Sequence, residues 1–296
     1  MSERVYEVTH RTVYNYEDEV TASYGRAHLT PRHGEGQRRV AAEITVDPAA
    51  AELRDHTDFF GNRSTYFAVT AVHTRLEITS RSTVAVSRAP VDPHELSDLT
   101  CDQIRELLDG TTDPDLIEAA TFRLPSPRVV PNPAVREFAA VLLAPHRPVG
   151  VVLLDLLERI HDDFAYVSGS TSVSTTTAEF LARREGVCQD FAHLAVAVLR
   201  TAGVPARYVS GYLETRPPPG RPRLQGADAS HAWASAHVPG HGWVDLDPTN
   251  RKLVDDSYVV VAVGRDYGDV PPLRGVIFTE SSGSTLDVSV DVVPVS

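Results

Sequence analysis

Gly186-Val187-Cys188-Gln189-Asp190-Phe191-Ala192 places a cysteine where an apolar run with helical spacing begins. Apolar residues continue to Leu199 on nearly every side of the expected helix, which indicates that this helix is buried. Gly203 and Pro205 predict its end, because glycine favours the position after a helix and proline cannot continue one. Cys188 is therefore expected in the first helical turn, where free amide groups and the positive end of the helix dipole favour a thiolate.

Two strand-like segments further along the chain supply a base and an acid. Residues 231–238 and 243–247 flank a Pro-Gly-His-Gly turn, which predicts a hairpin. A hairpin brings the start of its first strand beside the end of its second, so His231 and Asp247 are expected to meet. Asp245 lies on the same strand face as Asp247 and is the alternative acid. Asp247 is preferred because it stands at the strand end. A cysteine, a base and an orienting acid are the parts of cysteine nucleophilic catalysis.

Plainer interpretations stand beside this one. A free cysteine is most often a small buried core residue, so Cys188 alone is a weak signal and gains weight only from the partners that follow it. The histidines His231, His237 and His241 suggest a metal site, but the first two lie about 20 Å apart along one strand. No metal and no cofactor is therefore expected.

In these blocks the chain resembles the bacterial transglutaminase-like proteins, which are cysteine enzymes of the papain-like superfamily. The ordered blocks that carry the resemblance are Gly186-Val187-Cys188, residues 203–212, His231-Ala232-Trp233, Gly242-Trp243-Val244 and Asp247-Pro248-Thr249-Asn250. The resemblance implies a Cys-His-Asp triad of Cys188, His231 and Asp247. Papain-type proteases place their histidine much further from the cysteine and usually have Asn as the third residue. The additional domains and calcium sites of animal transglutaminases are not recognisable in this sequence.

The resemblance extends over most of the chain. Residues 6–14 and Asp58-Phe59-Phe60-Gly61-Asn62 are similar to the β-rich domain that precedes the catalytic core in one bacterial branch. Gly264-Arg265-Asp266-Tyr267-Gly268-Asp269-Val270, followed by Arg274-Gly275-Val276, is similar to the C-terminal pattern of that branch.

The order of predicted elements indicates an α+β fold with two domains. Residues 1–92 contain strand-like segments at 6–16, 39–46, 64–72 and 76–86, which predict an antiparallel β-sandwich-like domain. Residues 93–296 are expected to form a papain-like, transglutaminase-like core, with the catalytic cysteine at a helix N-terminus packed on an antiparallel sheet. Helices are predicted from Asn132-Pro133, around 151–157, and from the capping box at Thr176 to about Arg184. Strands are predicted at 207–213, 231–238, 243–247, 258–263 and 286–293.

Composition limits the partners and the compartment. A formal net charge of −12 makes nucleic acid and anionic membranes unfavourable partners. The start of the chain has no apolar signal-peptide core, and no apolar run is long enough for a membrane span. The two cysteines, Cys101 and Cys188, form no disulfide framework, so a reducing cytoplasm is expected. Cys101 is interpreted as structural because no block of partners accompanies it.

The expected reaction is acyl transfer from an amide or peptide bond through a thioester. Hydrolysis by a peptidase or amidase is favoured over cross-linking, because excluding water requires a specially dry site. Protein-glutamine transglutamination is the alternative, and a non-catalytic peptide-binding module is a further one. The Cys188 backbone amide is the first expected oxyanion donor, and Tyr166, Gln189 and Trp233 are further candidates for the oxyanion site or the cleft. The proline-rich stretch 216–223 is either a border of that cleft or an exposed stiff loop.

Overall fold

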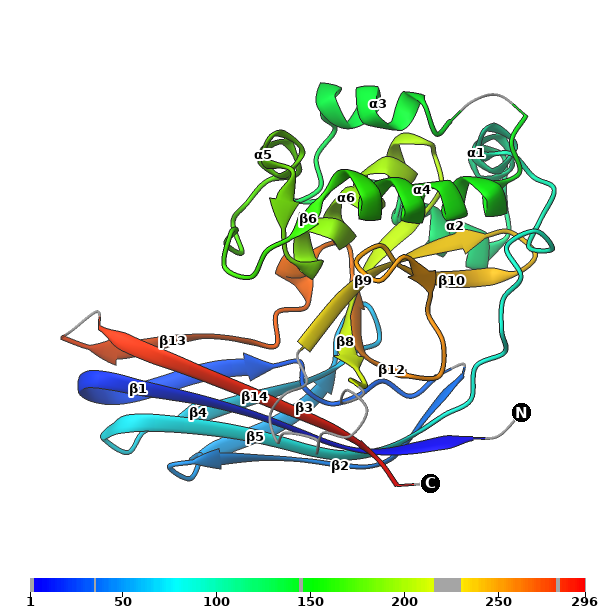
Figure 1. Ribbon diagram of the computed structural model, residues 1–296. Helices are drawn as coiled ribbons and strands as arrows, with labels where there is room; N and C mark the ends of the chain where they lie inside the picture. Colours follow the sequence, from blue (N-terminus) through cyan, green and yellow to red (C-terminus); the bar gives the residue numbers. More distant parts are fainter. Residues whose placement is uncertain (1–2, 35, 144–145, 216–229, 281–282, 296) are drawn as a thin grey trace, which may run out of the picture.

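The computed structural model describes residues 3–34, 36–143, 146–215, 230–280 and 283–295. A long antiparallel sheet forms one side of the molecule, and a second sheet with its helices stands on part of that sheet (Figure 1). This arrangement confirms the α+β fold, with a β-rich unit beside a transglutaminase-like core.

The first sheet has seven strands in its described residues, with the order β2-β5-β1-β4-β3 and with β13 and β14 also paired to β1. Its strands are β1 (Arg4–Ala27), β2 (Gln37–Asp47), β3 (Glu52–Thr57), β4 (Arg63–Val69), β5 (His73–Val86), β13 (Leu273–Thr279) and β14 (Ser284–Pro294). The first part of β1 pairs with β5 and β14, whereas its last part pairs with β4 and β13. The strands turn back at one end of the sheet (Figure 1).

Because the strands turn back, the sheet is curled and its two halves face each other. Leu76 and Ile78 of β5 share a hydrophobic cluster with Phe67 and Val69 of β4, and the partly buried Leu273 of β13 packs against it. This curled sheet is the observed form of the predicted sandwich-like domain.

The division of the chain at residue 92 does not anticipate the pairing of β13 and β14. These strands come from the end of the segment predicted as the catalytic core, yet they complete the first sheet. The physical reason is that β1 leaves one edge free for pairing along its length. In addition, the alternating apolar residues Val290 and Val292 of β14 are buried in the hydrophobic cluster between the two sheets. The N-terminal unit is therefore built from both ends of the chain.

The helices follow the sequence signals closely. They are α1 (Cys101–Asp109), α2 (Pro114–Thr121), α3 (Pro133–Ala140), α4 (Val149–Asp163), α5 (Thr177–Arg183) and α6 (Cys188–Thr201). Asn132 caps α3 with Pro133 in its first turn, and the predicted capping box of Thr176 and Glu179 starts α5. Gly203 follows α6 with a φ of 81°, a left-handed conformation that glycine adopts without strain.

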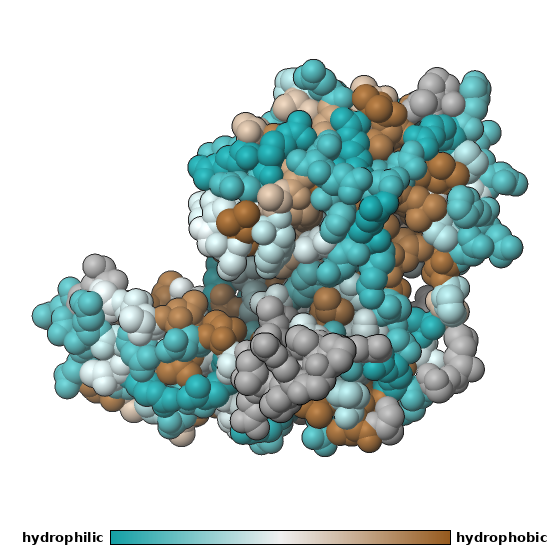
Figure 2. Space-filling model, viewed as in Figure 1, coloured by the Kyte–Doolittle hydropathy of each residue, from teal (hydrophilic) through white to brown (hydrophobic). Residues whose placement is uncertain are grey.

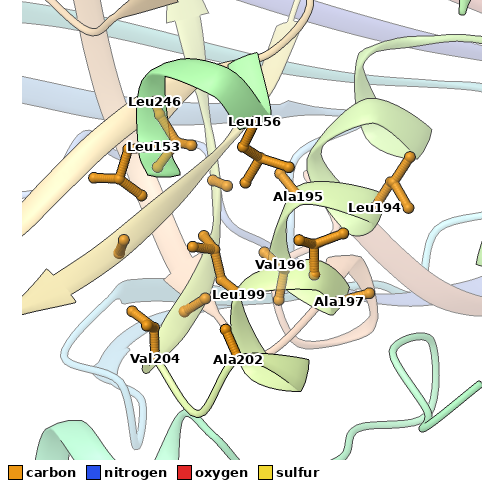
Figure 3. Packing of buried hydrophobic residues seen from close by; sticks show 14 of the residues in the cluster. Leu153, Leu156, Leu194, Ala195, Val196, Ala197, Leu199, Ala202, Val204 and Leu246 are labelled. Carbon is orange, nitrogen blue, oxygen red and sulfur yellow. The ribbon is translucent and has the colours of Figure 1, made fainter. Parts of the chain in front are cut away.

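The second sheet has the order β11-β10-β9-β8-β12. Its strands are β8 (Ala206–Leu213), β9 (Ser230–Val238), β10 (Gly242–Asp247), β11 (Lys252–Leu253) and β12 (Tyr258–Gly264). Helix α6 packs on this sheet, and α4 lies beside α6 and β10 and contributes to the same core. Leucines of α4 and α6 meet Val204 and Leu246 there, all of them fully buried (Figure 3).

Two amide side chains of the N-terminal unit bind the open edge of β12. Gln37 donates to the Val260 carbonyl and accepts from the Val260 amide, each at 2.8 Å. Asn62 makes the same pair of bonds with Val263, also at 2.8 Å each. These side chains take the place of a neighbouring strand, so the edge of the second sheet is satisfied and the two units are held together.

Candidate active site

Cys188 is the first residue of α6, as predicted, and its side chain is partly exposed. The buried Asp190 fixes this turn: its Oδ2 atom accepts the Val187 amide at 2.9 Å and the Thr171 hydroxyl at 2.6 Å. Gly186 is required here, because a Cβ atom at this position would lie 2.6 Å from the Phe180 ring. The backbone before the cysteine is therefore held tightly, which fixes the position of Cys188 in the first turn of α6.

The predicted hairpin brings His231 and Asp247 together. The Nε2 atom of His231 donates to Oδ2 of Asp247 at 2.7 Å. This bond leaves Nδ1 as the ring atom that faces other partners, and the side chains of His231 and Cys188 are also hydrogen-bonded. One acid, one imidazole and one thiol are thus connected in the order that the sequence predicts.

Asp247 is fully buried and saturated with hydrogen bonds. Its Oδ1 atom accepts the backbone amides of Thr249 at 2.9 Å and Asn250 at 3.2 Å. Its Oδ2 atom accepts, in addition to His231, the Asn250 side-chain amide and the Tyr258 hydroxyl, each at 2.7 Å. In the sequence Asn250 stands out only as part of a motif, and nothing there predicts a role for Tyr258, which begins the strand after the turn. No local sequence signal shows that this hydroxyl reaches back to the acid.

The electrostatics of the pair follow from its burial and its bonds. Burial acts to lower the pKa of His231, but the hydrogen bonds to Asp247 and Cys188 outweigh it and raise the pKa to about 10. Burial acts to raise the pKa of Asp247, yet the bonds from His231, Asn250 and Tyr258 keep it below its ordinary value. Both shifts favour an imidazolium beside a carboxylate at neutral pH.

The alternative acid, Asp245, belongs to a different group of charges. It pairs in register with Ser235, and its carboxylate interacts with the buried Arg207 and Arg88. Burial lowers the pKa of Arg207 to about 10, and Asp245 partly offsets this effect. The choice of Asp247 as the partner of His231 therefore agrees with the hydrogen bonding.

The remaining candidates lie in three kinds of environment. Tyr166 of β6 (Ala165–Tyr166) is 57% exposed and close to Cys188, because β6 pairs with β7 (Glu185–Gly186) directly before the cysteine. Gln189 is buried in the first turn of α6. Trp233 is fully buried and packs behind the His231 ring at 6.1 Å, so it supports the histidine and does not line an open cleft. The predicted border at 216–223 lies outside the described residues.

Cys101 differs from Cys188 in its surroundings. Burial and the neighbouring Asp102 raise the pKa of Cys101 to about 11, which keeps it a thiol at neutral pH. In the part of the chain that the structure describes, no group of three or more His, Cys, Asp or Glu side chains could hold a metal ion. No helix among the described residues is long and apolar enough to cross a membrane.

Comparison with known proteins agrees with this fold. Residues 6–85 match the bacterial transglutaminase-like N-terminal region, and residues 145–248 match the transglutaminase-like superfamily. An uncharacterized Mycobacterium tuberculosis protein is 52% identical over 294 residues, which cover 98% of this chain and 92% of that protein. The chain belongs to the bacterial transglutaminase-like family.

Two further proteins are similar to this chain. A protein-glutamine gamma-glutamyltransferase of Pseudomonas aeruginosa is 34% identical over 122 residues, which cover 40% of this chain and 18% of that enzyme. A crystal structure of a candidate cysteine protease from Cytophaga hutchinsonii covers 100% of this chain and 92% of its own, with a TM-score of 0.78 and 22% identity. At that identity the second similarity shows the shared fold alone.

Proposed function

We propose that the protein is a cysteine-dependent acyltransferase, in which Cys188 is the nucleophile, His231 the general acid–base and Asp247 the residue that orients the ring. The observation that carries this proposal is the 2.7 Å bond between His231 and the buried Asp247, together with the bond between His231 and Cys188. An imidazolium beside the sulfur stabilises a thiolate, which is the reactive form of cysteine.

The proposed reaction has two steps. The Cys188 sulfur attacks the carbonyl carbon of an amide, forming a C–S bond, and the imidazolium of His231 gives its proton to the departing amine as the C–N bond breaks. A second nucleophile then attacks the thioester, with His231 accepting its proton, and the Cys188 thiolate is released. The oxyanion in each step is stabilised by the Cys188 backbone amide at the helix N-terminus. The Tyr166 hydroxyl and the Gln189 amide are the candidates for the second donor.

Water is the preferred second nucleophile, so the substrate is a peptide or protein amide that becomes hydrolysed. The partly exposed Cys188 and the 57% exposed Tyr166 beside it support access of solvent to the thioester. The alternative, transfer to an amine, is favoured by the similarity to the glutamyltransferase. A cytoplasmic site of action is part of this proposal, because Cys101 and Cys188 are both free and form no disulfide.

A glutamine-containing peptide distinguishes these outcomes. Incubation with and without a labelled primary amine, with Cys188→Ala as the control, is followed by release of ammonia or of a peptide fragment and by incorporation of the amine. Product without incorporation supports hydrolysis, whereas incorporation supports transglutamination. Binding of the peptide without any Cys188-dependent product would support the non-catalytic alternative and contradict the proposal.

A further inference from the structure

The curled sheet contains a pocket that the proposed chemistry does not use. It lies between the two facing halves of the sheet and has a volume of about 220 Å³. Its apolar lining comes from several strands and consists of Tyr14, Tyr16, Tyr24, Phe67, Leu76, Leu273, Val276 and Ile277. Ligand pockets for small molecules begin at roughly 300 Å³, so this pocket suits one large side chain.

Two glycines line the pocket at points where other groups approach the backbone closely. Gly25 of β1 and Gly275 of β13 are direct partners in register, and both line the pocket. A Cβ atom at Gly25 would lie 2.2 Å from the Phe67 ring, and one at Gly275 would lie 2.5 Å from the Tyr24 carbonyl oxygen. Glycine weakens a strand interior, and it marks places where another group approaches the backbone closely. Glycine at these two positions therefore lets the Phe67 ring and the neighbouring backbone approach closely, and this tight packing forms one wall of the pocket.

The walls of the pocket are aromatic. The rings of Tyr14 and Tyr16 are stacked, with centroids 6.2 Å apart and an interplanar angle of 4°. Phe67 covers the floor from the neighbouring strand, and a polar pair, Ser23 and His73, is hydrogen-bonded at 2.9 Å next to Tyr16. Aromatic walls favour an aromatic guest, because offset and edge-to-face contacts add to the gain from apolar burial.

One face of β1 connects this pocket with the candidate active site. Tyr6 and Val8 belong to the buried cluster against which Cys188 packs, and His10 is bonded to Tyr212 of β8 at 3.0 Å. Tyr14 lies on the same strand face, about 20 Å beyond Val8 at roughly 3.3 Å per residue. Tyr14 also lies near Tyr267, which packs on the same cluster as Cys188.

The loop that carries Tyr267 is held in place from both sides. The buried His193 of α6 accepts the Tyr267 amide at 3.1 Å, and the Arg265 side chain is paired with Asp269 at 2.9 Å. The Tyr267 ring packs on Tyr208 with centroids 6.3 Å apart. The motif that the sequence singled out at 264–270 therefore fixes an aromatic side chain between the pocket and the start of α6.

The outer surface agrees with this arrangement. Figure 2 shows a hollow between the helical unit and the projecting end of the sheet, and hydrophobic residues gather on the part of the sheet that faces the hollow. On these strands Val276 and Phe278 of β13 and Leu286 of β14 are more than half exposed.

We propose that this pocket is a specificity subsite that binds an aromatic side chain of the peptide substrate, about six residues from the amide attacked by Cys188. The spacing corresponds to about 20 Å of extended peptide. This inference rests on the proposed function, because it takes Cys188 as the reacting residue. It assigns substrate recognition to the N-terminal sheet.

The test uses the full chain with Cys188→Ala, so that binding is measured without turnover. The probes are fluorescein-labelled peptides of Gly, Ser and one central Gln, with a single Phe or Ala placed four to eight residues from the Gln. Fluorescence anisotropy is expected to show binding of a Phe peptide about tenfold tighter than that of its Ala counterpart. Equal binding of the Phe and Ala peptides at every spacing would overturn the proposal.

Two substitutions fill the pocket, and one neighbouring substitution does not. Ser284→Phe and Ile277→Trp place bulk among the lining residues and are expected to remove the Phe preference. Thr285→Phe is the matched control, since Thr285 bonds to Asn15 on the opposite strand face, and it should retain the preference. Thermal unfolding verifies that each variant is folded, and Ile277→Trp replaces Ser284→Phe if the latter does not fold. An unchanged Phe preference in a folded pocket-filling variant would overturn the proposal.

The two proposals fail in different ways. Turnover by Cys188 without a preference for aromatic peptides would refute the subsite and leave the catalytic proposal intact. Pocket-dependent binding of the Phe peptide without a reactive Cys188 would support the subsite and refute the catalytic proposal.

Discussion

Asp247→Asn tests whether His231 must be held in one orientation and one tautomer, because it removes the carboxylate and leaves the histidine in place. The carboxylate accepts five hydrogen bonds, from Thr249, Asn250 twice, His231 and Tyr258. Asparagine can keep the two backbone bonds through its oxygen. Its NH₂ group then faces three donors. The His231 ring must therefore carry its proton on Nδ1, so that Nε2 can accept a hydrogen bond from this NH₂ group. That tautomer cannot take a proton from Cys188.

The size of the effect follows from the pKa of His231. Each tenfold change in proton affinity corresponds to about 1.4 kcal/mol. Raising the pKa from 6.5 to about 10 therefore requires roughly 5 kcal/mol of net interaction with the protonated ring, supplied by Asp247 and Cys188. Without the carboxylate, burial dominates and the imidazole is neutral near pH 7. A loss of about 10⁴-fold in kcat/KM is expected, which matches the tautomer penalty of catalytic triads.

The assay is NMR titration of His231 together with the rate of iodoacetamide labelling of Cys188 near pH 6. In Asp247→Asn, the pKa of His231 should fall below 6.5 and labelling should slow at least tenfold. Asp245→Asn is the matched control on the same strand and should change neither measurement. If His231 still titrates near 10 in Asp247→Asn, or if Asp245→Asn has the larger effect, the assignment of the acid is refuted.

Three smaller effects are also expected. Tyr258→Phe removes one bond to the buried carboxylate and should lower the free energy of unfolding by about 1.5 to 3 kcal/mol in urea titrations, and an unchanged value would contradict this account of Asp247. Burial lowers the pKa of His10 from 6.5 to about 4, so its contribution to stability is present above pH 6.5 and is lost as the pH falls towards 4. His10→Gln should therefore reduce the loss of unfolding free energy between pH 7 and 4.5 by about 2 to 3 kcal/mol. An unchanged dependence of unfolding free energy on pH would contradict this role of His10. Asn62→Ala leaves the Val263 amide and carbonyl without their partner and should cost about 2 to 4 kcal/mol of unfolding free energy, compared with Asn15→Ala on the exposed face as the control.

The sequence was sufficient where the signals are local. The start of α6 at Cys188, the capping box before α5 and the hairpin of β9 and β10 follow from spacing, caps and turn residues, and the structure confirms them. The meeting of His231 with Asp247 was predictable for the same reason, since a hairpin fixes its own register.

Features that depend on distant contacts were not predictable. The pairing of β13 and β14 with β1 joins segments more than two hundred residues apart, and no local pattern encodes such a partner. The bond from Tyr258 to Asp247 depends on how β12 is placed in the sheet, with Gln37 and Asn62 on its edge. Trp233 was a candidate for the cleft because an aromatic residue beside a histidine can face either way, and its burial follows from packing on Tyr258 at 5.3 Å.

The central claim is a reactive pair of Cys188 and His231, and intact-mass labelling with iodoacetamide across pH tests it most directly. Wild type should take up one label rapidly below about pH 7, Cys188→Ala should lose this fast reaction and His231→Ala should slow it. Cys101 should react slowly in every variant, because its pKa is raised to about 11. If Cys188 reacts only above about pH 8, or as fast without His231 as with it, the thiolate–imidazolium pair does not exist and the catalytic account is wrong.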